Sequence, residues 1–215
     1  FGERIELHNS NYGYLINKVV FYLMNGKIKP GSLYLARCYK NSVDYNQDPP
    51  LDEEGIKYAK NLTYTLFDHL EKSGNLQEKQ QQQEATPKDN NSLAIWTSVK
   101  RRTIETTQFF AAKNIPIRHR VQLSQKNPGI TGTLTDDEIR EKFPIEYAQY
   151  DHSPYHYRYP RAESYHDLAI KIEPLILEME RMSGDLLIIA DETVLQVFYG
   201  YLMSCSCDEI PNLNF

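Results

Sequence analysis

The sequence predicts an α/β fold, a three-layer α/β/α sandwich in which helices cover both faces of a mainly parallel sheet. Two observations predict this architecture. Short apolar segments of strand length alternate along the chain with longer segments of helical periodicity, and strands that alternate with helices form parallel sheets covered on both faces. The 215 residues are also enough for one domain with a substantial core.

The first expected elements are a helix, a strand and a second helix. Residues 1–31 contain an amphipathic segment that ends in Asn25-Gly26, a common helix stop, so we expect a leading helix there. The segment SLYLAR, 32–37, carries no charge before its arginine and is predicted to be a strand buried on both faces. From Asp52 to about residue 73 one helical face is apolar, formed by Ile56, Ala59, Leu62, Leu66 and Leu70.

A polar segment and a second strand occupy the middle of the chain. Residues 74–92 are nearly devoid of apolar side chains and include four consecutive glutamines, so we expect a mobile, Gln-rich loop. A strand at 93–98, a helix at 99–112 and an extended segment at 115–123 follow it.

Helix signals are clearest in the second half of the chain. Thr135 followed by Glu138 is a capping-box pattern at the start of a helix that Pro144 is expected to close. The tyrosine-rich residues 150–164 are expected to be an ordered loop. The alternating pattern is then completed by a helix at 165–182 that contains Pro174, a strand at 185–190 and a helix at 192–204.

Composition limits the classes of function. The net charge of −5 argues against nucleic acid or an anionic membrane as the main partner. No apolar run reaches the roughly 18 to 20 residues that span a bilayer, and the first residues lack a signal-peptide pattern, so we expect a cytoplasmic protein. Cys205 and Cys207 are too close to form an unstrained disulfide, and a metal site there is the less favoured interpretation. No other pattern selects a metal or a cofactor.

Three strand ends are the expected location of a site, because parallel α/β sheets bind ligands at the carboxyl ends of their strands. Arg37 and Cys38 follow the first strand, Arg101 and Arg102 follow the second, and Asp191 with Glu192 follows the last. Trp96 is expected to be a core residue because it lies inside a predicted strand.

Four segments resemble one known family: SLYLARCYKNS, LAIWTSVKRRTIETT, YRYPRAESYHDL and GDLLIIADETVLQVFYGYL. They are similar to the phosphatase half of the bifunctional 6-phosphofructo-2-kinase/fructose-2,6-bisphosphatases, within the histidine phosphatase superfamily. The resemblance covers nearly the whole chain. It implies a phosphoglycerate-mutase-like fold for residues 32–215, and it implies that residues 1–31 are a linker helix leading from a kinase half.

The same resemblance implies that the catalytic side chains are absent. That family attacks phosphorus with a histidine after the first strand, protonates the leaving alcohol with a glutamate, and holds the phosphoryl group with a second histidine. At these positions this chain has Cys38, Gln125 and Asp191. The resemblance therefore implies a domain without phosphatase activity.

The family's phosphate-binding residues are only partly retained. Arg37 and Arg102 match its two pocket arginines and Tyr165 matches a substrate tyrosine, but Glu192 stands where the family has a glutamine. Other family cations fall at Tyr150, Pro154 and Gln196. We expect a vestigial phosphate pocket in which the two arginines pair with Asp191 and Glu192; residual anion binding is the alternative.

Two alternatives would keep an enzyme. Cys38 is a candidate nucleophile, although the position six residues on, where cysteine phosphatases need an arginine, is Asp44. His152 and His156 in the tyrosine-rich loop are the histidines that could serve in place of the lost ones. A small side chain beside Arg37 and two solvated loop histidines are the favoured interpretations.

The resulting hypothesis is a pseudophosphatase domain of a 6-phosphofructo-2-kinase, with a structural or regulatory role in controlling fructose 2,6-bisphosphate and glycolysis. Its expected partners are the kinase half of the same polypeptide, possibly a sugar phosphate, and a second copy through that other half. No cofactor is expected. A slow or altered sugar-phosphate phosphatase and a non-catalytic sensor of phosphorylated metabolites are the alternative functions.

Overall fold

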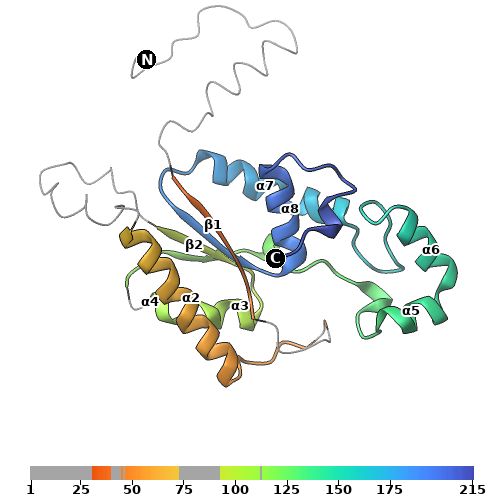
Figure 1. The fold of residues 1–215 in the computed structure, drawn as a ribbon, viewed down its shortest axis with the longest axis horizontal. Coiled ribbons are helices and arrows are strands. Elements are labelled where there is room, and N and C mark those ends of the chain that lie inside the picture. The colour runs from red at the N-terminus through yellow and green to blue at the C-terminus, as the bar shows by residue number, and fades with distance from the viewer. Residues whose placement is uncertain (1–30, 40–44, 46, 73–92, 112) are drawn as a thin grey trace, which may run out of the picture.

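A computed structural model describes residues 31–39, 45, 47–72, 93–111 and 113–215 (Figure 1). The predicted leading helix, apart from Gly31, and the Gln-rich loop at 74–92 lie outside the described residues. Apart from Gly31, the described residues fall within 32–215.

The described strands form one parallel sheet with the order β1-β4-β2-β3. The strands are β1 (Leu33–Arg37), β2 (Ala94–Thr97), β3 (Ile117–His119) and β4 (Leu186–Ala190). β4 lies between β1 and β2, and all of its residues are buried. An uninterrupted apolar strand is typical of this central position in a parallel sheet.

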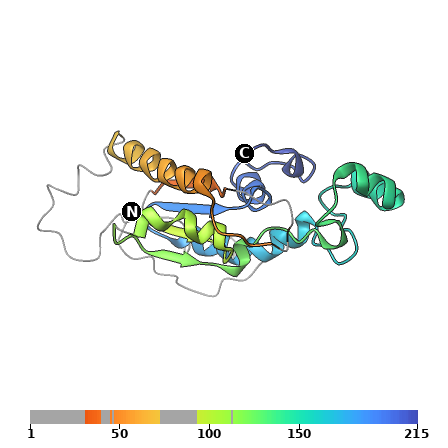
Figure 2. The same ribbon diagram turned by 90° about the horizontal axis from the view of Figure 1, so that it is seen from below.

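Helices cover both faces of the sheet (Figures 1 and 2). One face packs against α2 (Glu53–Lys72), α3 (Arg101–Thr106) and α4 (Gln108–Ala111), and the other against α7 (Tyr165–Arg181) and α8 (Glu192–Leu202). β4 divides its side chains between these layers, because Leu187 and Ile189 belong to the α2 side while Leu186 and Ile188 belong to the α7 and α8 side. The predicted three-layer α/β/α sandwich is thus confirmed.

Burial differs from the expectation in two places. In β1 only Ala36 is buried, whereas the strand was expected to be buried on both faces. β1 lies at the edge of the described sheet, which leaves its other residues partly exposed. In α2, Ile56 is 43% exposed and the helix instead buries Gly55, Ala59, Thr63, Leu66 and Leu70. The small residue at 55 allows the helix to turn that side toward the loop at Leu51.

The segment expected to be one helix at 99–112 forms two short ones, α3 and α4. Hydroxyls compete with the helical hydrogen bonds here: Thr106 Oγ1 donates to the Arg102 carbonyl and Thr107 Oγ1 to the Ile104 carbonyl. The extended segment expected at 115–123 is limited to β3 and is followed by a 3-10 helix, Val121–Leu123.

The capping box at Thr135 is present and starts α5 (Asp136–Lys142). Pro144 does not only end this helix; it is also the first residue of α6 (Pro144–His152), which the sequence analysis missed. Proline suits a first helical position because its missing N–H would have no partner there. The predicted loop at 150–164 therefore begins three residues late, and α5 and α6 lie together beyond the end of the sheet (Figures 1 and 2).

Helix α7 begins at the residue after Ser164, which forms a second capping box with Asp167. Its inward face buries six residues and, with α8, forms the larger hydrophobic core. A last 3-10 helix, Ile210–Asn212, follows α8 and contributes Ile210 to that core. Trp96 is fully buried in the same cluster, as expected.

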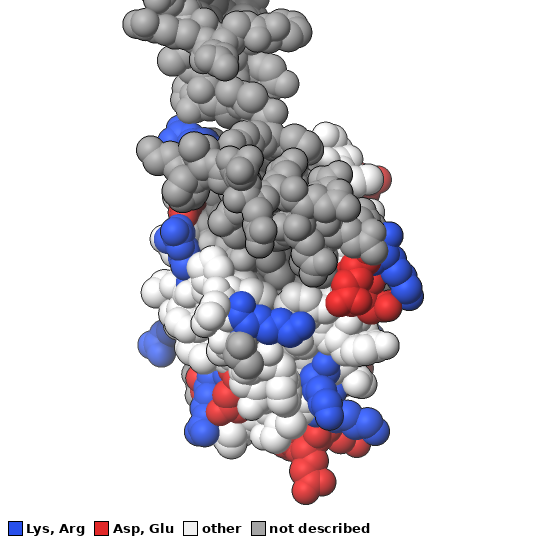
Figure 3. Space-filling view, turned by 90° about the vertical axis from the view of Figure 1, so that its left-hand side faces the viewer, with Lys and Arg blue, Asp and Glu red and all other residues white. Residues whose placement is uncertain are grey.

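The described surface in Figure 3 mixes acidic and basic side chains. Such alternation of charge is typical of an ordinary solvated surface. Among the helices that the structure describes, none is both long and apolar enough to cross a membrane.

Candidate functional site

The ends of β1 and β4 bring two of the predicted segments together. Arg37 is paired in register with Ala190, and the Cys38 N–H donates to the Ala190 carbonyl at 2.9 Å. Asp191 and Glu192 therefore follow directly beside Arg37 and Cys38. The parallel register explains why sequence reasoning could place these four residues in one site.

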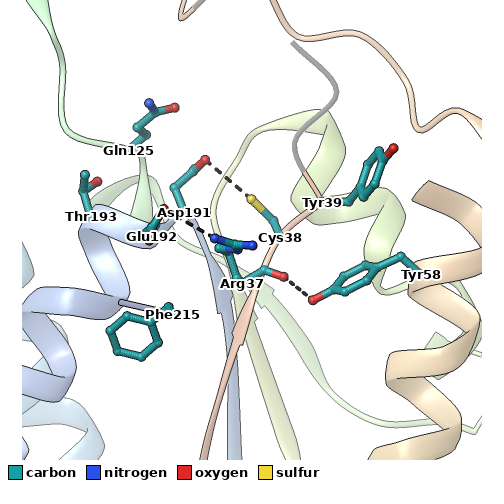
Figure 4. Close-up of a pocket in the computed structure, with 9 residues that line it drawn as sticks. All are labelled: Arg37, Cys38, Tyr39, Tyr58, Gln125, Asp191, Glu192, Thr193 and Phe215. Atoms are coloured by element: carbon teal, nitrogen blue, oxygen red, sulfur yellow. Dashed lines mark hydrogen bonds and ion pairs between the residues drawn. The ribbon is translucent and has the colours of Figure 1, made fainter. Parts of the chain in front are cut away.

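A cavity of about 690 Å³ opens at these strand ends (Figure 4). Tyr39 and Tyr58 stand on one side of it, and Thr193 and Phe215 stand on the other. The residues that line it are Arg37, Cys38, Tyr39, Tyr58, Gln125, Asp191, Glu192, Thr193 and Phe215.

Arg102 and Asp191 form a buried ion pair at this site. Their side chains are 3% and 7% exposed, and Arg102 Nη2 donates to Asp191 Oδ1 at 2.6 Å. Burial alone would lower the pKa of Arg102, but the charge and hydrogen bond of Asp191, together with Cys38, raise it overall. Arg102 Nη2 also donates to Gln125 Oε1 at 2.8 Å. The guanidinium is thus held by side chains of the protein itself.

A second, weaker pair joins Arg37 and Glu192. Arg37 Nη1 lies 3.5 Å from Glu192 Oε2, and the two side chains are 53% and 43% exposed. Exposed pairs at this distance contribute little to stability. The predicted pairing of the two arginines with Asp191 and Glu192 is present in the structure, and it balances two positive charges with two negative ones.

Cys38 is a buried, protonated thiol. It is 4% exposed, and its Sγ donates to Asp191 Oδ1 at 3.5 Å. Burial, followed by the negative charge of Asp191, raises the pKa of the Cys38 thiol to about 12. Because the thiolate is the attacking species, Cys38 is poorly suited to nucleophilic attack at neutral pH. Asp44 lies outside the described residues.

Gln125 is brought to the cavity by the loop after the 3-10 helix Val121–Leu123. Its amide oxygen accepts the hydrogen bond from Arg102. A primary amide carries no proton that it could give to a leaving alkoxide at physiological pH. The loop therefore positions a polar side chain that cannot act as a general acid.

Tyr165, expected in the vestigial pocket, does not line the cavity. It is 5% exposed in the core between α7 and α8, and its hydroxyl donates to Gln196 Oε1 at 2.7 Å. Burial raises the pKa of Tyr165, so the phenol stays protonated. A buried phenol needs a hydrogen-bond partner, and Gln196, where the resemblance implies a lost arginine, supplies it.

The tyrosine-rich loop brings neither histidine to the cavity. His152 ends α6, and the His156 ring packs against Tyr155 and His166 with ring centroids 5.0 and 5.4 Å away. Neither residue lines the cavity. Tyr150 and Pro154 do not line it either. In the described chain no group of three metal-ligating side chains surrounds Cys205 and Cys207 or any other point.

Several lining residues were missed by sequence reasoning. Tyr58 lies on α2 and its hydroxyl donates to the Arg37 carbonyl. A helical wheel contains a signal for it, because position 58 is one turn from the buried Gly55. Phe215 reaches the cavity through the fold of the last segment, where its ring packs against Tyr199. No local sequence pattern indicates such a contact.

Similar sequences share a bifunctional name. Residues 39–215 match the family model for the histidine phosphatase superfamily, branch 1. The chain is 44% identical over 229 residues to a Saccharomyces cerevisiae protein provisionally named 6-phosphofructo-2-kinase/fructose-2,6-bisphosphatase. The alignment covers 100% of this chain and 43% of the yeast protein. Human 6-phosphofructo-2-kinase/fructose-2,6-bisphosphatase 1 is 31% identical over 221 residues, covering 97% of this chain and 42% of the human one. The chain spans less than half the length of these relatives.

Similar solved structures share the fold. Bacillus stearothermophilus YhfR has a TM-score of 0.65 and 24% identity, covering 86% of each chain. A mycobacterial glucosyl-3-phosphoglycerate phosphatase solved with inorganic phosphate has a TM-score of 0.60 and 17% identity, covering 85% of this chain and 83% of that one. The predicted phosphoglycerate-mutase-like fold is confirmed.

Proposed function

Since the chain belongs to the histidine phosphatase superfamily as a fructose-2,6-bisphosphatase-like domain, we propose that it is a catalytically inactive phosphatase domain of a 6-phosphofructo-2-kinase. Its role is structural or regulatory. The protein that contains it then acts as a net synthase of fructose 2,6-bisphosphate and so influences glycolysis.

The buried Arg102–Asp191 pair is the observation that carries this proposal. An arginine in a phosphate site must be free to donate to phosphate oxygens, yet Arg102 Nη2 is 2.6 Å from a carboxylate and 2.8 Å from an amide oxygen. A phosphate would have to compete with a charge that is already desolvated and in place. Arg102 is thereby not free to bind the anion that the chemistry requires.

Electrostatic repulsion adds to this competition. A phosphate about 4 Å from one carboxylate is repelled by about 1 kcal/mol in water and by about 4 kcal/mol at an effective dielectric constant near 20. Asp191 is buried and Glu192 is half-exposed, so the repulsion from Asp191 is closer to the larger value. Both carboxylates therefore disfavour a bound phosphate.

Hydrolysis of a phosphate ester would also lack a nucleophile and a general acid. A covalent mechanism needs a nucleophile, and the raised pKa of Cys38 keeps that side chain a thiol. General acid catalysis contributes about 10²- to 10⁴-fold, and Gln125 has no acidic proton. These losses argue against a slow phosphatase built on the same cavity.

The partner of the domain is, in this proposal, a kinase half of the same polypeptide, through which two copies could also associate. The relatives' bifunctional names and their greater length support the presence of a kinase half. ATP binding would belong to that half, and we propose a cytoplasmic location for the whole protein.

The test is incubation of the purified chain with labelled fructose 2,6-bisphosphate, with an active bisphosphatase run in parallel. We expect neither a phosphoenzyme nor released phosphate above background. Release of phosphate would overturn the proposal. If release occurred and disappeared in Cys38→Ala, the altered phosphatase that uses this thiol would replace it.

A non-catalytic sensor of phosphorylated metabolites is a second candidate. The observation that favours it is the cavity itself, which remains open with about 690 Å³ of space despite the paired charges. Calorimetric titration with fructose 6-phosphate tests this candidate, since a sensor binds the sugar phosphate without turning it over.

A further inference from the structure

Lys126 is a partly buried cation whose charge the described protein does not neutralise. Its Nζ lies 4.9 Å from the centroid of the Tyr165 ring. Across the described residues this ammonium has no hydrogen bond and no ion pair, and its one recorded partner is that ring. An aromatic face compensates only in part for the water that a half-buried ammonium has lost.

Glu163, the acidic side chain whose charge acts on Lys126, already has other partners. Glu163 accepts from Lys171 Nζ at 3.1 and 3.0 Å, and it also accepts from the Asn127 N–H at 2.8 Å. Glu163 acts on Lys126 only at a distance. Burial lowers the pKa of Lys126, and the field of Glu163 opposes that change. Lys126 is thus the uncompensated cation of this loop.

Lys126 stands beside the candidate site. It follows Gln125, which lines the cavity, and its backbone N–H lies 3.4 Å from Thr193 Oγ1, which lines the cavity too. The ammonium contacts the ring of Tyr165. The negative charge of Glu192, which lines the cavity, helps to raise the pKa of the Tyr165 phenol. Lys126 does not itself line the cavity, so it stands at the margin, next in sequence to one lining residue and in backbone contact with another.

The two pocket arginines contrast with this lysine. Arg102 is held by Asp191 and Gln125, and Arg37 is paired with Glu192. A ligand that used Arg102 would have to displace a buried carboxylate, and a ligand that used Arg37 would share that guanidinium with Glu192. A ligand that used Lys126 would displace only water and a ring contact, and it would supply the missing negative charge.

We infer that Lys126 is the anion-binding residue of this domain, and that it binds the phosphate group of a small phosphate monoester. The inference rests on the proposed function only in assuming that the ligand is bound and not hydrolysed. An ammonium is a compact charge with three donors, which suits a single phosphate group approached from solvent. The position of the bound anion is thus displaced from the paired arginines toward the loop at 125–127.

The experiment is calorimetric titration of the 215-residue chain with fructose 6-phosphate, and separately with inorganic phosphate. It compares the unchanged chain with Lys126→Met, Arg37→Met and Lys142→Met. Lys142→Met removes the same charge from an exposed pair with Glu138 on α5, away from the cavity. Thermal unfolding of each variant verifies that it is folded.

We expect Lys126→Met to weaken binding of fructose 6-phosphate by at least about ten-fold, since hydrogen bonds to charged groups are of that strength. Lys142→Met should bind within about three-fold of the unchanged chain, given the usual scatter of surface charge effects, and Arg37→Met should lose less affinity than Lys126→Met. A second supporting result is that inorganic phosphate binds, fructose 6-phosphate does not bind more tightly, and Lys126→Met weakens phosphate binding by the same factor. That result would show that the sugar adds little affinity.

Two results would overturn the inference. One is equal affinity in the unchanged chain and in folded Lys126→Met. The other is the absence of binding heat with both probes at millimolar concentration. Neither result bears on turnover, which the phosphate-release assay measures independently, so failure of this inference and failure of the proposed function are distinguishable.

Discussion

At the scale of single residues, the Arg102–Asp191 ion pair adds little net stability, but removing one of its two members is strongly destabilising. Taking two charges out of water costs most of what their attraction returns, and Arg102 Nε and Asp191 Oδ2 have no hydrogen-bond partner in the described structure. The pair is therefore a weak source of net stability. Both members are nevertheless needed for stability, because removing one leaves the charge of the other buried without a partner.

Replacing Asp191 with alanine should lower the free energy of unfolding by about 3 to 5 kcal/mol, because it leaves the Arg102 charge buried without a partner. Urea-induced unfolding measures the change. The matched control is Glu192→Gln in the exposed pair, which should change stability by less than about 1 kcal/mol. Comparable losses in the two variants would contradict the assignment of Arg102–Asp191 as the buried pair.

The cysteines should differ in reactivity. Cys38 is buried with a thiol pKa of about 12, whereas Cys207 is exposed. We expect iodoacetamide at pH 8 to alkylate Cys207 in minutes to hours and to leave Cys38 unmodified until the chain is unfolded, since the thiolate is the reactive form. Peptide mass spectrometry identifies the site. Modification of Cys38 in the folded chain at a rate near that of Cys207 would show that its thiol is accessible and ionised.

At the scale of helices and strands, the capping box of α7 sets where this core-forming helix begins. The Ser164 hydroxyl accepts from the Asp167 N–H at 3.0 Å, and the Asp167 carboxylate accepts from the Ser164 N–H at 2.9 Å. These bonds also lower the pKa of Asp167. The residue that follows is Tyr165, whose hydroxyl bonds α7 to α8 through Gln196.

Ser164→Ala should cost about 1 kcal/mol of unfolding free energy, within the usual range of about 0.5 to 2 kcal/mol for loss of a capping side chain. Chemical denaturation measures it. Ser164→Asp keeps a capping acceptor and should recover part of the loss. A cost in Ser164→Ala that Ser164→Asp does not reduce would show that packing at this buried serine, and not capping, is responsible.

The elements that the sequence predicted well are those whose pattern is local. β4 is a continuous apolar run and α7 has both a cap and an apolar stripe, so each could be identified without knowledge of its neighbours. The sequence analysis missed α6, because Pro144 was taken as the end of one helix and not as the start of the next. Ile56 was misplaced because the buried face of α2 includes Gly55 and Thr63, which an apolar pattern does not mark.

The site divides in the same way. Arg37, Cys38, Arg102 and Asp191 could be predicted to meet because parallel strands end at one edge of a sheet. Tyr165 was assigned to the pocket from the resemblance alone, yet the packing of α7 on α8 directs its hydroxyl to Gln196. Phe215 depends on how the last residues fold against the strand ends, which no sequence spacing encodes, whereas for Tyr58 the only sequence signal is its spacing from Gly55.

At the scale of the whole molecule, Ile210 anchors the last segment of the chain to the core. Ile210 is 7% exposed in the cluster with α7 and α8, and the Gln196 amide donates to the Leu213 carbonyl at 2.7 Å. This segment also carries Phe215 to the cavity. The shape of the candidate site therefore depends on packing of the segment that follows α8.

Ile210→Ala should reduce the free energy of unfolding by about 2 to 4 kcal/mol, through lost burial and the cavity left behind. Thermal and urea unfolding measure the loss. Met203→Ala removes a side chain that is 60% exposed and should cost less than about 0.5 kcal/mol. Equal, small effects of both changes would mean that the segment after α8 is not packed as described.

Ionic strength should act unequally on the two arginines. Dissolved ions screen charges that are exposed to water, so a high salt concentration weakens the half-exposed ion pair of Arg37 with Glu192. The buried ion pair of Arg102 with Asp191 is screened much less. At high salt concentration the guanidinium of Arg37 is therefore less often paired with Glu192, whereas Arg102 stays paired with Asp191.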